Sequence, residues 1–285
     1  MSLPVTRFAP SPTGRLHLGH AYSALFAYEK VYATGGKFIL RIEDIDPVRC
    51  KPEYEAGIFE DLRWLGLAWE FPVRCQSNYM RDYEDALGKL HAQDLLYPCF
   101  CSRKDIRDEI ERAGVAPHGP EGAIYPGICK SLSTQEQEDR IAAGDPYAFR
   151  LDMDKAIKMV GTELEWVDLD KGKQIATPQI LGDVVLARKD ISTCYHLSVT
   201  LDDHIQGVTT VTRGMDLFYA THLHRLLQAL LGLNVPEWHH HPLLLDENGK
   251  RLAKRDKAVT IEHMRKVDKL TAQEVQAKTG IQLPY

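Results

Sequence analysis

The sequence predicts an α/β protein built on a parallel sheet, and three consecutive segments carry this prediction. A turn rich in Pro and Gly, residues 9–17, precedes residues 18–34, where apolar side chains recur at helical spacing and Gly35-Gly36 ends the helix. The short apolar run 38–42 has the composition of a buried parallel strand. Strand, helix and strand in this order make a βαβ unit, so we expect a Rossmann-type sheet of the kind that binds nucleotides.

Composition narrows the class of protein. A chain of 285 residues can bury a sizeable core, so we expect one full domain with an insertion. Its 44% apolar and 26% charged residues are ordinary for a soluble globular protein. No apolar run approaches the ~18 residues of a membrane helix. The N-terminal MSLPVTRFAPSP lacks the apolar core of a secretory signal, so we expect a cytoplasmic protein with no membrane partner. The net charge of -5 leaves only a local basic patch for contact with nucleic acid.

The pattern of residues divides the chain into four parts. Residues 1–74 carry the first half of the sheet, and the character of the sequence changes near Cys75. We expect an inserted subdomain over 75–174, the second half of the sheet over 175–260, and a short C-terminal stub over 261–285.

Elements within these parts follow from the spacing of apolar residues. In the insertion we expect helices over 79–96 and 133–143, on either side of a segment rich in Gly, Pro and Cys over 99–130. In the second half we expect strand-like segments over 183–188, 195–205 and 208–212 and an amphipathic helix over 219–231.

Residues 7–20 read RFAPSPTGRLHLGH and combine a rigid turn with the start of a helix. A helix that begins near Leu18 aims its free N–H groups and its positive dipole end at the turn, which favours bound phosphate. His17 and His20 are three residues apart, so both can face that ligand from the first helical turn. The alternative is a proline-rich loop with two solvated histidines.

Acidic residues follow the strand 38–42 directly, beginning with Glu43. Ligands of open α/β sheets sit beyond the carboxyl ends of the strands, so Glu43 is well placed to contact one. Read alone, Glu43 would more often be a helix cap. Two fixed arginines, Arg7 and Arg213, lie beside Pro- or Gly-rich turns near expected strand ends, and the planar guanidinium suits a carboxylate ligand.

The cysteines indicate a metal site in the insertion and no disulfide framework. Cys99 and Cys101 can bind one zinc ion, and Cys129 arrives as a third ligand after the Gly- and Pro-rich loop. The residues alone favour His118 as the fourth ligand; the alternative is three buried thiols without a metal.

Residues 202–204 (Asp-Asp-His) look like a metal triplet, but neighbouring residues of a strand point to opposite faces. The triplet His239-His240-His241 is expected to begin a strand.

Two motifs together resemble the class I aminoacyl-tRNA synthetases. RFAPSPTG with HLGH resembles the HIGH signature in its glutamyl form, and residues 249–255 (GKRLAKR) resemble the KMSKS loop in its KLSKR form. Two positions depart from that loop, because Arg251 stands in place of the first lysine and Ala253 in place of the serine. A basic surface loop is the alternative for this second motif.

The resemblance implies roles for named residues. His17, His20 and Lys254 would be catalytic, since a cation at Lys254 can meet the charge that develops on phosphoryl oxygens. ATP, with Mg²⁺, would be bound by His17, Gly19, His20 and Lys254. Glutamate would be bound by Arg7, Phe8, Ala9, Pro10, Ser11, Glu43, Tyr195 and Arg213.

The resemblance also bears on the metal site. Short paralogues of the glutamyl synthetases carry a C-x-C…Y-x-x-x-C pattern, matched here by Cys99, Cys101, Tyr125 and Cys129. It therefore implies one zinc per chain with Tyr125 as the fourth ligand, where the residues alone favour His118.

Only 28 residues follow Lys257 (285 − 257), too few for an anticodon-binding domain. The whole chain resembles the truncated paralogues, the glutamyl-Q tRNA(Asp) synthetase family. That family activates L-glutamate with ATP without tRNA and transfers it to queuosine at the wobble position of tRNA(Asp), and we expect a monomer with these partners. The alternatives are a minimal glutamyl-tRNA synthetase that charges tRNA(Glu), a non-catalytic tRNA-binding module, and a nucleotidyltransferase with the same HxGH loop.

Overall fold

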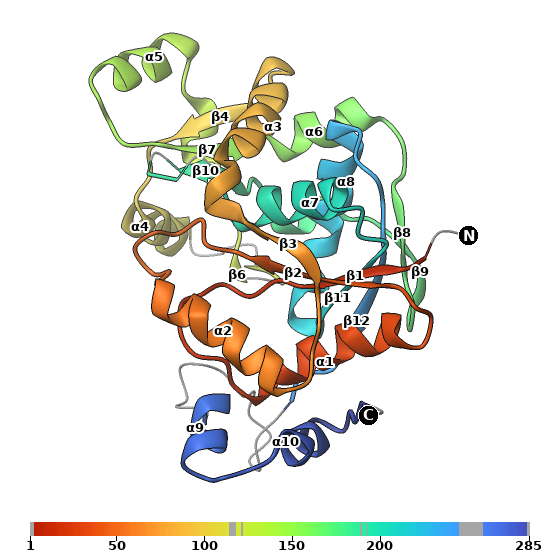
Figure 1. Cartoon of the computed structure of the whole chain (residues 1–285). Helices are drawn as coiled ribbons and strands as arrows, with labels where there is room; N and C mark the ends of the chain where they lie inside the picture. The colour runs from red at the N-terminus through yellow and green to blue at the C-terminus, as the bar shows by residue number, and fades with distance from the viewer. Residues whose placement is uncertain are drawn as a thin grey trace.

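Two sheets that lie side by side form the central layer of the computed structural model, which describes residues 3–113, 118–120, 122–188, 190–191, 193–244 and 259–283 (Figure 1). Its first half is the parallel sheet β1-β2-β3, made by Val5–Phe8, Lys37–Ile42 and Glu70–Cys75. The crossovers are α1 (Leu18–Tyr32) and α2 (Pro52–Trp64), which both lie below these strands in Figure 1.

The second half of the layer is β11 (Thr210–Gly214), β12 (Glu237–His241) and β8 (Glu165–Asp168), parallel to one another, with β9 (Gly172–Ile175) antiparallel to β8. The halves meet where β1 lies beside β11. The backbone N–H of Thr209 donates to the carbonyl of Val5 at 3.0 Å, and Nη1 of Arg7 donates to the carbonyl of Thr212 at 2.8 Å. The carboxyl ends of β1 and β11 are therefore neighbours, the usual place for a ligand in such sheets.

A separate antiparallel sheet, β10-β7-β4, is made by Val185–Arg188, Ala148–Leu151 and Leu96–Cys99. It lies at the top of the molecule, near α3 and α5, in the view of Figure 1. The remaining helices are η1 (Gln76–Tyr79), α3 (Met80–Ala92), α4 (Arg103–Ala113), η2 (Ile128–Ser131), α5 (Thr134–Ala142), α6 (Met153–Val160), η3 (Pro178–Leu181), α7 (Tyr195–Ile205), η4 (Met215–Leu217), α8 (Ala220–Leu231), α9 (Ile261–Lys266) and α10 (Ala272–Thr279). A short hairpin joins β5 (His118–Gly119) to β6 (Gly122–Ala123).

Two apolar clusters hold these layers together. One joins α1, α2 and the first sheet, and α10 adds Val275 to it. The other joins α3, α7 and α8. The carbonyl of Leu65 accepts a hydrogen bond from Nε2 of Gln276 at 2.9 Å, which ties α10 to the end of α2. None of the described helices is long and apolar enough to cross a membrane.

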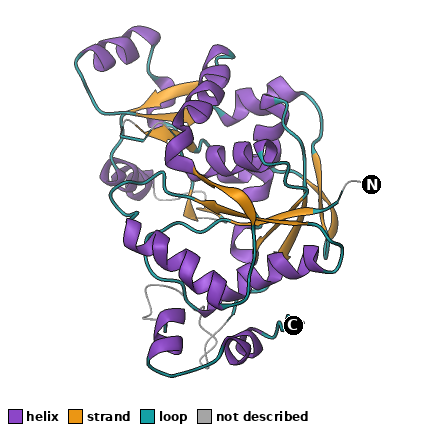
Figure 2. Ribbon diagram, in the orientation of Figure 1, coloured by secondary structure: helices purple, strands orange, loops and turns teal. Residues whose placement is uncertain are grey.

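The structure confirms the expected α/β class and parallel sheet, and most expected elements within a few residues (Figure 2). Helix 18–34 is observed as α1, and strand 38–42 as β2. The boundaries of the insertion, expected at 75 and 174, stay predictions. Strand β10 follows the expected insertion in the chain but pairs with β7 inside it. Strand β8 lies inside the expected insertion but pairs with β12 of the second half and with β9.

One element was predicted wrongly. Residues 195–205 form a helix, α7, and not a strand. Seven consecutive residues of α7, from Leu197 to Asp203, are buried, so the helix is enclosed on all sides and lacks the 3.6-residue amphipathic pattern. Apolar residues at every second position, Leu197, Val199 and Leu201, therefore gave the two-residue periodicity that is typical of a strand.

Candidate active site

A cavity of about 420 Å³ opens at the carboxyl ends of β1 and β11. Every residue expected to bind glutamate or ATP lines it, except Lys254, which lies outside the described residues. These lining residues are Arg7, Phe8, Ala9, Pro10, Ser11, His17, Gly19, His20, Glu43, Tyr195 and Arg213.

One wall of the cavity is the N-terminus of α1, where two histidines cap the helix. Nδ1 of His17 accepts from the N–H of Gly19 at 3.1 Å, and Nδ1 of His20 accepts from the N–H of His17 at 3.2 Å. Because both Nδ1 atoms accept, each ring carries a proton on Nε2. The cavity wall thus combines two Nε2–H donors with the positive end of α1, a set that suits an anion such as phosphate.

Described residues on both sides of the segment that resembles the KMSKS loop lie beside this wall. Residues 245–258, and with them Lys254, are not described. Before the segment, Leu243 and Leu244 line the cavity. After it, Thr260 forms a β-bridge with His17, and the N–H of Ile261 donates to the carbonyl of Leu16 at 2.9 Å.

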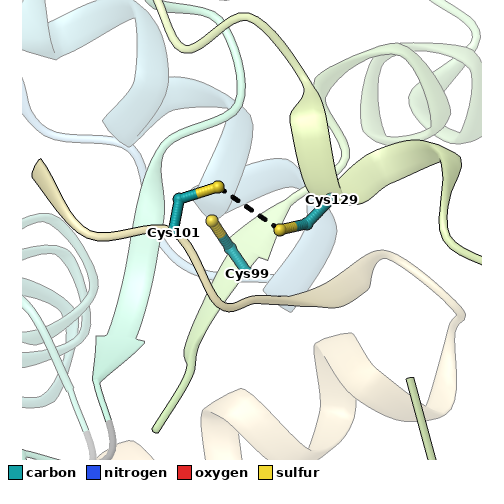
Figure 3. Close-up of side chains that lie close together, drawn as sticks. All are labelled: Cys99, Cys101 and Cys129. Atoms are coloured by element: carbon teal, nitrogen blue, oxygen red, sulfur yellow. Dashed lines mark hydrogen bonds between the residues drawn. The ribbon is translucent and has the colours of Figure 1, made fainter. Parts of the chain in front are cut away.

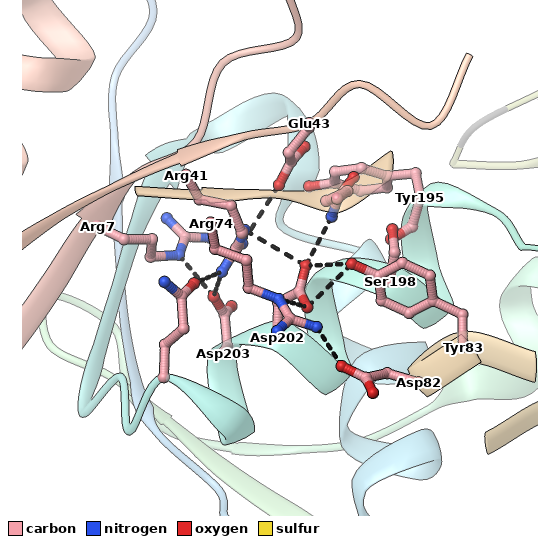
Figure 4. A network of polar contacts seen from close by, with 12 residues as sticks. Arg7, Arg41, Glu43, Arg74, Asp82, Tyr83, Tyr195, Ser198, Asp202 and Asp203 are labelled. Atoms are coloured by element: carbon pink, nitrogen blue, oxygen red, sulfur yellow. Dashed lines mark hydrogen bonds and ion pairs between the residues drawn. The ribbon is translucent and has the colours of Figure 1, made fainter. Parts of the chain in front are cut away.

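Buried arginines and carboxylates from four elements form a network behind the cavity (Figure 4). Oδ1 of Asp203 on α7 accepts from Nε of Arg7 at 3.0 Å and from Nη1 of Arg41 at 2.8 Å. Nη2 of Arg41 in turn donates to Glu43 at 3.2 Å. Burial raises the pKa of Glu43 to about 7, although Arg41 and Arg7 oppose the shift.

Asp202, the neighbour of Asp203, has the same kind of partners. Arg74 and Gln76 donate to it at 2.7 and 2.8 Å, and the hydroxyl of Tyr83 at 2.9 Å. The carboxylates of the Asp-Asp-His triplet are therefore buried counter-ions of arginines, and the strand geometry expected for this triplet was wrong.

Arg213, at the end of β11, has different neighbours. Its side chain is 6% exposed, and it donates from Nε to His240 at 3.1 Å, from Nη1 to His224 at 3.1 Å and from Nη2 to the hydroxyl of Thr221. Burial and the charge of Arg213 lower the pKa of His240 to about 4 and that of His224 well below its usual value. Both rings are thus neutral near pH 7, and burial lowers the pKa of Arg213 itself.

Comparison of the sequence with known protein families agrees with a cavity that binds a nucleotide and an amino acid. The family model of the catalytic domain of class I tRNA synthetases for glutamate and glutamine matches residues 5–279. The chain belongs to the class I tRNA synthetases. It is thus an enzyme of the aminoacyl-tRNA synthetase type.

Among curated relatives of this synthetase, a glutamyl-Q tRNA(Asp) synthetase of Rhodobacter capsulatus is 50% identical over 263 residues, which cover 89% of this chain and 92% of the relative. A glutamate–tRNA ligase of Aquifex aeolicus is 38% identical over 264 residues, which cover 92% of this chain and 53% of the relative. A crystal structure of a glutamate tRNA ligase from Elizabethkingia meningosepticum in complex with its amino acid has a TM-score of 0.75 and 31% identity, covering 90% of this chain and 53% of that one. This synthetase spans about half the length of the glutamate–tRNA ligases that it matches.

The synthetase carries a second cluster of reactive side chains away from the cavity (Figure 3). The sulfurs of Cys99, Cys101 and Cys129 lie within 4.8 Å of one another, the one group of metal-ligating residues found among those that the structure describes. Sγ of Cys101 lies 3.4 Å from Sγ of Cys129. The hydroxyl of Tyr125 lies 3.3 Å from Sγ of Cys99 and 3.5 Å from Sγ of Cys101.

These distances fit a tetrahedral metal site. Zinc ligands at about 2.3 Å (sulfur) and 2.0 Å (oxygen) stand about 3.5 to 3.8 Å apart. Burial raises the pKa of Cys101 to about 12, whereas the pKa of Cys99 is lowered because its hydrogen bonds with Tyr125 and Arg150 outweigh its burial. The side chain of His118, the other predicted ligand, lies outside the described part of the chain.

The contacts that hold the arginines and Glu43 in place were not predicted from the sequence. Arg41 and Asp203 hold Arg7 and Glu43, while His224 and His240 hold Arg213. The signal for His240 was the histidine triplet, which does form a strand, β12, as expected. Alternation along that strand turns the middle histidine to the side opposite its two neighbours, but the sequence does not say which side faces Arg213.

Proposed function

We propose that this synthetase activates L-glutamate with ATP, forming glutamyl-adenylate without tRNA, and transfers the glutamate to queuosine at the wobble position of tRNA(Asp). In the first step an oxygen of the α-carboxylate of glutamate attacks the α-phosphorus of ATP, and the bond to the departing pyrophosphate breaks. In the second step a hydroxyl of the acceptor attacks the acyl carbon, an ester forms, and AMP leaves.

The observation that carries the glutamate assignment is the surroundings of Arg213. Arg7, Arg41 and Arg74 each have an aspartate within 3.0 Å. Arg213 is equally buried, yet among the described residues its hydrogen-bond partners are two neutral histidines and two hydroxyls, those of Thr221 and Tyr195. A buried cation without a counter-ion is costly, so an anionic group of the ligand would be stabilised there.

The same cavity also contains groups that can bind the positively charged ammonium group of an amino acid. An amino acid substrate has an ammonium group, which needs an acid or a hydroxyl to receive it. Glu43 and Tyr195 line the cavity together with Arg213 and supply both. A ligand with one ammonium group and a side-chain carboxylate matches this set, which supports glutamate as the substrate.

At the phosphate end, His17 and His20 would donate through their Nε2–H groups to phosphoryl oxygens, aided by the N-terminus of α1. Lys254, in the segment that resembles KMSKS, would stabilise the charge on the departing pyrophosphate. The two flanks of this segment lie at the cavity wall, which supports that role. Mg²⁺ bound with ATP would neutralise part of the phosphate charge.

The proposal that queuosine in tRNA(Asp) accepts the glutamate is supported by the similarity to named relatives. The relative at 50% identity is named for glutamyl-Q and tRNA(Asp), and this chain covers 92% of its length. The glutamate–tRNA ligases are next in similarity, for example at 38% identity, which keeps the charging of tRNA(Glu) as a second candidate.

We propose zinc for the cysteine cluster, held by Cys99, Cys101, Cys129 and Tyr125. The hydroxyl of Tyr125 accepts from the N–H of Cys129 at 2.9 Å, which stabilises a negative oxygen, and the guanidinium of Arg150 lies 3.7 Å over the ring. These contacts support Tyr125 over His118. A closed four-ligand site is structural and contributes folding energy to the part of the chain around it.

Glutamate-dependent exchange of pyrophosphate with ATP, measured without tRNA, tests the activation step. We expect exchange with glutamate and only background rates with glutamine or aspartate. Background rates with glutamate, in protein that still binds ATP, would overturn the proposed activation step.

A further inference from the structure

We propose that two histidine relays, Asp168–His240 and His196–His224, are positioning groups that fix Arg213 and thereby make the pocket select a carboxylate over a carboxamide. This inference rests on the proposed function, since it assigns the substrate carboxylate to Arg213. It adds four residues that do not line the cavity, one from each of the four elements β8, β12, α7 and α8.

The first relay fixes the tautomer of His240. Nδ1 of His240 lies 2.7 Å from Oδ2 of Asp168, and both side chains are fully buried. A carboxylate can only accept, so Nδ1 carries the proton and Nε2 is left with a lone pair. This lone pair accepts from Nε of Arg213 at 3.1 Å, and the hydroxyl of Thr221 lies 3.3 Å from the same atom.

The second relay fixes His224 by the same logic. Nδ1 of His224 accepts from Nη1 of Arg213, so the proton of this ring is on Nε2. Nε2 lies 3.1 Å from Nδ1 of His196, which accepts it. The proton of His196 must then be on its own Nε2. Each ring in the two relays has one tautomer that satisfies every contact.

The consequence concerns the five N–H groups of Arg213. Nε uses its one N–H on His240, while Nη1 and Nη2 each use one, on His224 and Thr221. One N–H remains on each terminal nitrogen; one of the two donates to the hydroxyl of Tyr195, and the other is available to a ligand. Either oxygen of a carboxylate can accept this N–H, whereas the N–H₂ of a carboxamide placed there would meet a donor, because the lone pairs of both histidines are already used.

Asp168→Asn tests the relay. Oδ1 of Asp168 accepts from the N–H groups of Asp170 and Lys171 at 3.1 and 3.0 Å, and an asparagine can keep both bonds. Its amide N–H₂ would then face Nδ1 of His240 and move the proton to Nε2, against the N–H of Arg213. A similar change in a catalytic triad fixes the wrong tautomer without altering the geometry.

In pyrophosphate exchange we expect Asp168→Asn to raise the KM for glutamate by about 10- to 100-fold and to lower the preference for glutamate over glutamine by at least about tenfold. The KM for ATP and the melting temperature should stay close to those of the wild type. His240→Gln is the conservative variant, since one amide can accept from Arg213 and donate to Asp168, and it should retain most of the preference.

His222→Gln is the matched control. His222 is a buried histidine on the same helix as His224, but its Nδ1 accepts from the N–H of Thr177 and not from Arg213. It should leave the preference for glutamate unchanged. The proposal is overturned if Asp168→Asn folds and keeps both the KM and the preference, or if it lowers stability and the use of ATP and glutamate alike. A wild-type protein that fails to activate glutamate would instead contradict the proposed function.

Discussion

Oδ1 of Asp203 lies 3.0 Å from Nε of Arg7, although 196 residues separate the two in the chain. The contact links the strand that begins the first half of the sheet to the helix that precedes β11 in the second half. Arg41 contacts the same oxygen, so one carboxylate compensates two buried guanidinium groups beside the cavity.

Asp203→Asn should therefore destabilise the protein. It removes the carboxylate that pairs with Arg7 and one of the three carboxylates that pair with Arg41, and breaking a buried ion pair typically costs about 3–5 kcal/mol. Unfolding by denaturant, followed at the midpoint and slope, measures this loss. Asp190→Asn is the control, because the ion pair of Asp190 with Arg188 is exposed and should contribute close to nothing. Equal stabilities for the two variants would contradict the role of Asp203.

Glu43 makes glutamate binding depend on pH near neutrality. Burial raises its pKa to about 7, so the carboxylate that would receive the ammonium group is protonated as the pH falls below this value. The KM for glutamate in pyrophosphate exchange should rise as the pH falls from 8.5 to 6, by about tenfold per unit once the pH is below 7. Glu43→Gln should show a raised KM that no longer changes with pH, and a flat wild-type profile would remove Glu43 from the ammonium site.

Asp61 on α2 should lower the stability of the protein at high pH. Its side chain is fully buried, and burial raises its pKa to about 6, which Arg265 only partly offsets. A folded-state pKa above the unfolded value favours the protonated form in the folded protein. The stability is therefore full below about pH 4 and falls as the pH rises from 4 to 6.

Asp61→Asn removes this penalty. The variant should be more stable than the wild type at pH 8, by up to about 3 kcal/mol, and the two should converge near pH 4. Denaturant unfolding at both pH values measures the difference. An asparagine variant that is less stable than the wild type at pH 8 would show that the ion pair with Arg265 outweighs the burial.

The cysteine cluster should bind about one zinc per chain. Metal analysis of protein purified without a polyhistidine tag measures it, and Cys101→Ser or Cys129→Ser should lose the metal. Local unfolding should then begin around β4 and η2, before the parallel sheet opens. Cys75→Ser is the control, since Cys75 contacts Glu55 and not the cluster. A wild-type protein that contains no zinc and is fully active would contradict the metal site and show that the three cysteines are free thiols.

The parts of the fold that could be predicted from the sequence are those set by local residues. The turn before α1, the helix itself and the strand β2 follow one another within 42 residues, and each has its own composition and end signals. The capping of α1 by His17 and His20 is local as well, because both acceptors lie within one helical turn of their donors.

The surroundings of Arg213 could not be predicted, because its partners come from distant parts of the chain. Asp168 is 72 residues from His240, and nothing in the sequence near either one indicates the contact. The error at α7 has a related cause: its burial on all sides depends on how α3, β10 and α8 pack around it. The sequence suggested Asp202 and Asp203 as a weak candidate for a metal site. In the structure both carboxylates form buried ion pairs with Arg41.

The transfer of labelled glutamate to tRNA(Asp) tests the central claim most directly. Two preparations of the same tRNA(Asp) are compared, one that carries queuosine and one made without it, with tRNA(Glu) as a third acceptor. The proposed function predicts that, with ATP present, label appears only on the tRNA(Asp) that carries queuosine. Equal labelling of both preparations, or labelling of tRNA(Glu) at its 3′ end, would contradict it.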